Sequence, residues 1–106
     1  MLAHTIKRFG IEARMFEGEN PSEMEALIDD KTRAIFFESL SSPQMVIIQM
    51  EEIVQIAKKH KTLIIGDNIV VTACLFKPFD FGIDVAVYDT SEYVSGQGTG
   101  IGGAIV

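Results

Sequence analysis

Hydrophobic and polar residues follow short patterns along the chain, and each change of period predicts a new element. Between Ile11 and Phe16 apolar and polar side chains alternate, which is the two-residue period of a β-strand. A helical period begins at Met50, where apolar residues recur three or four positions apart and charged residues face away. The further apolar positions of this helix are Ile53, Val54 and Ala57.

Compact apolar runs predict further strands. AIFFE, residues 34–38, is typical of a strand that is covered on both faces. A second run, residues 62–65, stops at the polar residues of a Gly-Asp-Asn turn, and a third run covers residues 85–87. Residues 104–106 are suited to the start of one more strand.

Local stop and start signals predict two helix ends. One helix is expected to end just before Gly10, because glycine accepts the positive φ that closes a helix. Asn20 and Pro21 mark a turn, after which Ser22 and Glu25 have the spacing of an S-x-x-E capping box. A short helix is therefore predicted after this turn.

Strand and helix alternate at βαβ spacing, which predicts one α/β domain over residues 1–106, with a mainly parallel sheet and helices on both faces. An unrelated flavodoxin-like domain is the alternative, and no motif supports it. Ligands of such sheets bind beyond the carboxyl ends of the strands. Three polar clusters follow strands here: residues 38–42, Asp67 with Asn68, and residues 88–92.

Composition and charge exclude several classes of function. The chain is 47% hydrophobic and 23% charged, and it has no apolar run near the ~20 residues of a membrane span. Its net charge is −6 and its nine Lys and Arg residues are scattered, which argues against nucleic acid as a partner. The single Cys74, the lack of a secretory signal pattern and the lack of clustered metal ligands predict a cytoplasmic protein without a metal site.

A glycine-rich stretch near the end, SGQGTGIGG, formally contains G-x-G-x-x-G at Gly98, Gly100 and Gly103. A dinucleotide fingerprint needs a helix directly after the glycines, so that phosphate meets the free N–H groups of its first turn. The three residues that follow are typical of a strand. The stretch is therefore interpreted as a tight loop with close backbone approach.

Several blocks, read together at their spacing, resemble one family over essentially the whole chain. They are RFGIEAR, EALIDDKTRAIFFES, LIIGDN, LFKPFDFGID and SEYVSGQGTGIGGAIV. The family is that of the pyridoxal-phosphate enzymes of cysteine and methionine metabolism, which includes cystathionine γ-synthase, methionine γ-lyase and O-acetylhomoserine sulfhydrylase. The resemblance implies the central part of the large domain of a pyridoxal-phosphate-dependent transferase, an aspartate-aminotransferase-like fold. It also implies a small amino-acid substrate and a homo-oligomer.

The same resemblance assigns roles to five positions. Asp67 matches the aspartate that pairs with the pyridine nitrogen of the cofactor, and Ser91 keeps the hydroxyl of a family threonine. Ser42 replaces an asparagine that contacts the phenolic oxygen, and Asp89 replaces a serine that donates to the phosphate. Glu92 stands where the family has the lysine that forms the Schiff base, and a carboxylate cannot form an imine.

These replacements predict a sulfhydrylase-like fragment that has no turnover alone and does not hold pyridoxal phosphate covalently. Additional carboxylates near a doubly charged phosphate also oppose tight binding. The alternative is a non-catalytic binding or assembly module, or an engineered α/β domain. Apolar surface around residues 45–48 and at sheet edges is expected to favour self-association.

Overall fold

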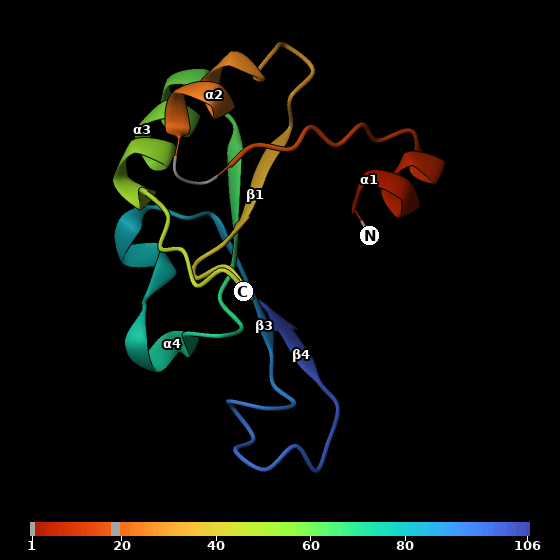
Figure 1. The fold of residues 1–106 in the computed structure, drawn as a ribbon, viewed down its shortest axis with the longest axis vertical. Coiled ribbons are helices and arrows are strands. Elements are labelled where there is room, and N and C mark those ends of the chain that lie inside the picture. Colours follow the sequence, from red (N-terminus) through yellow and green to blue (C-terminus); the bar gives the residue numbers. More distant parts are fainter. Residues whose placement is uncertain (1, 18–19) are drawn as a thin grey trace.

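The computed structural model describes residues 2–17 and 20–106, and four strands form its sheet. The strands are β1 (Ala34–Glu38), β2 (Leu63–Asp67), β3 (Val85–Asp89) and β4 (Gly103–Ile105), in the spatial order β1-β2-β3-β4. β1, β2 and β3 pair in parallel, and β4 pairs antiparallel with β3. The expected mainly parallel sheet is confirmed, and β4 extends it with a strand of opposite direction (Figure 1).

The other elements are helices, of which one is long enough to organise the core. The α-helices are α1 (Leu2–Thr5), α2 (Pro21–Ala26), α3 (Met50–His60) and α4 (Thr72–Leu75). Two 3-10 helices are η1 (Ile6–Phe9), which continues α1, and η2 (Pro78–Phe81). No helix in the described ranges is long and apolar enough to cross a membrane.

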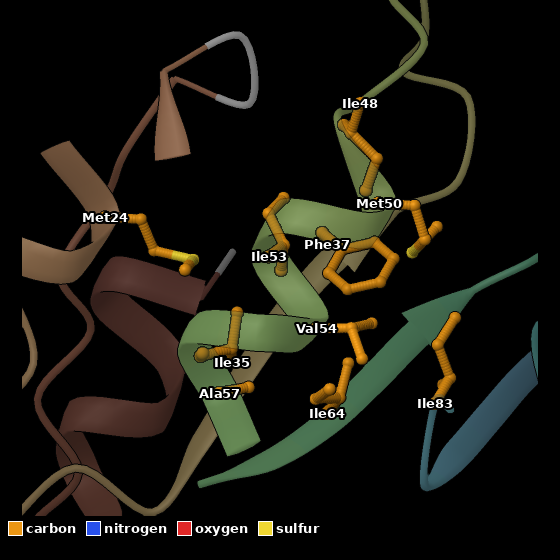
Figure 2. Packing of buried hydrophobic residues seen from close by; sticks show 10 residues of the cluster. All are labelled: Met24, Ile35, Phe37, Ile48, Met50, Ile53, Val54, Ala57, Ile64 and Ile83. Atoms are coloured by element: carbon orange, nitrogen blue, oxygen red, sulfur yellow. The ribbon is translucent and has the colours of Figure 1, made fainter. Parts of the chain in front are cut away.

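α3 confirms the helical period predicted from Met50. The four apolar residues predicted to face the core are buried, and acidic residues in the first turn and basic residues in the last turn match the helix dipole. Figure 2 shows Ile53, Val54 and Ala57 of this helix opposite Ile35 and Ile64 of the sheet. Burial of this apolar stripe against β1 and β2 therefore holds the helix in place.

The sheet has one buried face and one open face. In β1 burial alternates strictly, so Ile35 and Phe37 are buried while Phe36 remains 40% exposed. Leu63 of β2, which pairs with Ala34, is 54% exposed on the same side as Phe36. The expectation that residues 34–38 are covered on both faces is wrong, because α3 covers only one of them. α1 lies on the other side of β1 from α3, and it leaves these side chains accessible (Figure 1).

The strand predicted over residues 11–16 does not form. These residues are extended, but no strand in the described ranges pairs with them. Arg14 ties the segment to the body of the domain through Leu27 O at 2.8 Å and the Asp29 carboxylate at 2.8 Å. An alternating pattern favours a strand only where a neighbour supplies hydrogen bonds, and the sequence pattern does not reveal that neighbour.

The short helix α2 was predicted, but it begins earlier than expected and without the predicted capping box. Pro21 is the first helical residue and Asn20 is the N-cap; the Asn20 side chain donates to Glu23 Oε1 at 2.8 Å. Glu25 does not reach back to the helix start. It binds Lys59 Nζ at 2.7 Å and lies 3.0 Å from His60 Nε2, so it connects α2 to α3 instead.

Gly66 has a packing reason to lack a side chain. A Cβ atom at this position would lie 3.2 Å from Ile83 Cδ1 and 3.6 Å from Phe37 Cε2. Ile83 is 3% exposed and belongs to the core cluster. The space beside residue 66 is therefore filled from the chain segment that leads into β3.

Candidate functional site

Three carboxylates lie in a row at the carboxyl edge of the sheet. Glu38 ends β1 and pairs with Asp67 at the end of β2, while Asp67 pairs with Val87, two residues before Asp89 at the end of β3. Because side chains alternate along a strand, Glu38, Asp67 and Asp89 share the open face of the sheet. We call these three residues the acidic row.

Each carboxylate of the acidic row accepts a backbone N–H from the loop that follows its strand. Glu38 Oε2 accepts from Ser42 N at 3.1 Å, Asp67 Oδ1 from Ile69 N at 3.0 Å, and Asp89 Oδ1 from Ser91 N at 2.6 Å. This local pattern is common for Asp after a strand, because the side chain caps the first turn of the loop. It fixes the orientation of all three carboxylates.

A small hollow of about 160 Å³ opens beside Asp67. Ser42 and Glu38 line it from the β1 side, and Ile69 and Val70 line it from the loop after β2. The structure thus places Ser42 and Asp67, two of the predicted site residues, around one hollow. From the sequence, Glu38 is only the polar residue at the end of a strand. The parallel register places it beside Asp67, and this register joins residues that are far apart in the sequence.

Asp67 is the carboxylate of this row whose charge is least favoured. Partial burial raises the pKa of Asp67, and the nearby Glu38 and Asp89 carboxylates raise it further, while the Ile69 N–H partly opposes them. The pKa of Asp89 is lowered, because the Ser91 hydroxyl and N–H both stabilise its ionised form. Among the described residues, no group of three or more His, Cys, Asp or Glu side chains is placed to hold a metal ion.

Asn68, which the sequence grouped with Asp67, does not join the site. It is fully buried on the other side of the strand end, and its Nδ2 donates to Phe76 O at 3.1 Å and to Tyr88 Oη at 3.4 Å. One residue further along a strand reverses the direction of the side chain. Asn68 therefore stabilises the core side of the loop after β2.

The glycine-rich stretch forms the loop between β3 and β4. Thr90 N donates to Gly102 O at 2.9 Å, and Gly102 N donates to Ser91 Oγ at 3.1 Å, so the base of the loop is closed. Gly96 and Gly98 have φ of 77° and 62°, values that glycine accepts easily. A strand and not a helix follows the glycines, as expected. The loop itself is long and open rather than tight, because an added Cβ atom at Gly96 or Gly100 would meet nothing within 4 Å. Glu92 is exposed in this loop.

A larger hollow of about 540 Å³ lies elsewhere and is mainly apolar. Leu40, Ile48, Met50 and Phe76 line it, together with Ser39, whose buried Oγ has no hydrogen-bond partner in the described chain. None of the acidic row lines this hollow. The two hollows share Leu40 as a lining residue, and Glu38 and Asp67 line only the smaller one.

We expect Asp67→Asn to leave the domain equally or slightly more stable at neutral pH. The raised pKa means that the folded state binds more protons than the unfolded state just above the ordinary Asp range, so ionisation of Asp67 lowers stability as pH rises through that window. Water screens a partly exposed group, so the gain should stay below about 1 kcal/mol. Urea unfolding at several pH values measures the change in the free energy of unfolding, and Asp30→Asn at an exposed position is the control. A clear loss of stability for Asp67→Asn at neutral pH would contradict this reading.

Comparison with known proteins identifies the family of this site. The family model for Cys/Met metabolism PLP-dependent enzymes matches residues 1–106. Homocysteine/cysteine synthase of Saccharomyces cerevisiae is 39% identical over 103 residues, which are 96% of this chain and 23% of that protein. The chain thus spans about a quarter of the length of this relative.

Two solved structures share the fold closely. A chain assigned as O-acetylhomoserine (thiol)-lyase of Campylobacter jejuni is 55% identical with a TM-score of 0.94; the match covers 97% of this chain and 25% of that one, which carries N′-pyridoxyl-lysine-5′-monophosphate. Cystathionine gamma-lyase of Lactobacillus plantarum, in complex with L-serine, is 30% identical with a TM-score of 0.94 and is covered to 28%. The extent of these matches shows that the chain belongs to the family of pyridoxal-phosphate-dependent enzymes of cysteine and methionine metabolism.

Proposed function

We propose that this chain is a sulfhydrylase-like segment that keeps the contact to the pyridine nitrogen of pyridoxal phosphate but has no catalytic turnover alone. The single observation that carries the proposal is the position of Asp67 in an edge that is otherwise acidic. Glu38 and Asp89 flank it, and Glu92 follows in the next loop. The cofactor would need an amine at this edge.

One part of the site fits the cofactor. Asp67 is held by the Ile69 N–H and borders a hollow, so its carboxylate is oriented and accessible. A carboxylate in this setting suits a protonated ring nitrogen, because the positive charge would relieve the repulsion from Glu38 and Asp89. Asp67 would thus pair with the ring nitrogen and keep it protonated, in a cofactor that acts as an electron sink when bound.

The rest of the site does not fit a covalently held cofactor. Glu92 offers no amine, and Asp89 places a negative charge where a phosphate donor is needed. Lys31 precedes β1 and Lys61 precedes β2, so these amines lie at the amino ends of the strands, opposite the acidic row. A phosphate at the carboxyl edge would therefore meet the acidic row and not these two ammonium groups, while Lys77 lies in the segment that follows β2.

Incubation with pyridoxal phosphate followed by borohydride reduction tests the proposal. We expect no reduced pyridoxyl adduct in the loop of residues 89–103, since it contains no lysine, and only a low level on exposed lysines elsewhere. Peptide mass mapping locates any label, and a short lysine peptide at the same concentration sets the background. Stoichiometric labelling of one lysine in the folded chain, with turnover of O-acetylhomoserine, would overturn it.

The proposal also covers the substrate, the assembly and the cellular location of the whole protein. A small amino-acid substrate, a homo-oligomer and a cytoplasmic location are inferred from membership of the family and are parts of this proposal. An assembly module without catalysis is the second candidate. The open face of the sheet favours it, because Phe36 and Leu63 remain accessible in the described structure.

A further inference from the structure

The fully buried side chain of Asn68 supports the loop that follows β2. Its Nδ2 donates to Phe76 O at 3.1 Å and to Tyr88 Oη at 3.4 Å, while its Oδ1 is buried with no hydrogen-bond partner among the described residues. A buried amide oxygen without a partner costs stability, and an apolar residue of similar shape would avoid this cost. The two donated bonds, and not core packing, are therefore what an amide supplies at this position.

Both ends of α4 are bound to Asn68. Thr72 N, at the first residue of the helix, donates to Asn68 O at 3.1 Å, and Phe76 O, just after the last residue, accepts from the Asn68 side chain. α4 has four residues, and a single helical turn is not stable without contacts from outside. Asn68 is itself fixed to the sheet, because its N–H donates to Val87 O at 2.8 Å. Asn68 therefore connects the loop of residues 69–76 to the sheet.

The backbone of this loop is strained, so its conformation needs such a connection. Thr72 has φ of 56°, in the left-handed region that a β-branched residue rarely adopts. A residue stays in this region only where its surroundings fix it. The bonds that Asn68 makes to Thr72 N and Phe76 O hold the loop at and after the strained residue, and they oppose its return to an ordinary conformation.

The same loop carries the N–H that orients Asp67. The pKa of Asp67 is raised by burial, lowered by the bond from Ile69 N at 3.0 Å, and raised by two flanking carboxylates. These carboxylates belong to Glu38 of β1 and Asp89 of β3. The backbone of Asp67 is fixed separately, since its O accepts from Ser39 N at 2.9 Å. Movement of the loop would therefore take the Ile69 N–H away from the carboxylate and leave the strand end in place.

We infer that Asn68 is a positioning residue for Asp67: it holds the loop of residues 69–76 in the conformation in which the Ile69 N–H meets the Asp67 carboxylate. Asn68 lies on the core side of the strand end and Asp67 borders the hollow on the other side, so the loop between them transmits the effect. The use of an oriented Asp67 for the pyridine nitrogen rests on the proposed function. The positioning of its carboxylate does not.

NMR titration of the carboxyl groups in the chain without cofactor tests the inference, and Asp67→Asn identifies the signal of Asp67. Asn68→Ala removes both donated bonds, so we expect the pKa of Asp67 to rise. Its acid dissociation constant should fall at least about threefold, because the ionised form loses the Ile69 N–H. Asp89 is held by Ser91 in a different loop, and its pKa in the same spectra should not shift.

Tyr88→Phe is the matched control for Asn68→Ala. It removes only the 3.4 Å contact and leaves the bond to Phe76 O, so the pKa of Asp67 should stay unchanged. A shift as large as that of Asn68→Ala would overturn the inference, because the loop is still held at Phe76. An unchanged Asp67 pKa in folded Asn68→Ala would also overturn it. So would equal shifts of Asp67 and Asp89, which indicate a general loosening of the domain.

Amide hydrogen exchange in the unaltered chain provides a second test, which does not require Asn68→Ala to fold. A loop closed by Asn68 should open as one unit, so the N–H groups of Ile69, Thr72 and Phe76 should have protection factors within about threefold of one another. An Ile69 N–H that opens much more readily than the other two would contradict the inference. These measurements use no pyridoxal phosphate, so their outcome is separate from that of the proposed function.

Discussion

Glu92→Lys is expected to let the chain form a covalent adduct with pyridoxal phosphate that the unaltered chain does not form. The substitution removes a negative charge from the carboxyl edge and adds a primary amine in the loop that follows β3. Reversal of this charge should raise the apparent affinity for the cofactor at least about tenfold. Adding Asp89→Ser should raise it further, since the serine can donate to phosphate and no longer repels it.

The adduct is measured by borohydride reduction and peptide mass mapping, and its yield should rise with pH as the lysine loses its proton. Glu92→Arg is the matched control. It supplies the same positive charge without an amine that can form the adduct, so it should improve binding but give no reduced product at residue 92. Equal labelling of Glu92→Lys and the unaltered chain would show that this loop does not reach the cofactor beside Asp67.

The second large effect is expected for Ile53→Ala in the middle of α3. Ile53 is fully buried among Met24, Ile35 and other core residues, and α3 forms the layer over the covered face of the sheet. Loss of its outer carbons leaves a cavity, for which about 2–5 kcal/mol of destabilisation is typical. A domain of this size has only about 5–10 kcal/mol of stability, so the variant should be close to unfolding at room temperature.

Urea unfolding followed by circular dichroism, at one protein concentration, measures this loss. Leu75→Ala in α4 removes a similar side chain that is 83% exposed, and its effect should stay within about 0.5 kcal/mol. If the two variants were equally stable, α3 would not provide the core that the structure shows.

Elements with a strong local signal could be predicted from the sequence. The period of α3, the apolar run of β1 and the glycine after η1 are each contained within a few residues, and the structure has all three. The segment of residues 11–16 shows the limit, because its alternation is real but its formation as a strand depends on a distant partner. Which face of β1 is covered depends in the same way on where α3 packs.

The candidate site was predictable to a similar extent. Loops after parallel strands meet at one edge, which is why Ser42 and Asp67 were expected together and lie around one hollow. Glu38 and Asn68 could not be sorted in this way. The face of the sheet on which each of these two side chains lies depends on the strand register and on the residue at which each strand ends. Neither can be read from the local sequence.

The contact between the backbone of β2 and Ile83 restricts the order in which this sequence can change. A side chain at residue 66 would crowd Ile83, because an added Cβ atom would already lie 3.2 Å from Ile83 Cδ1 and Ile83 would have to shift. A smaller residue at 83 alone opens a void in the core. A larger residue 66 is therefore expected to be favoured together with a changed residue 83, and the two positions should vary together among descendants of this chain.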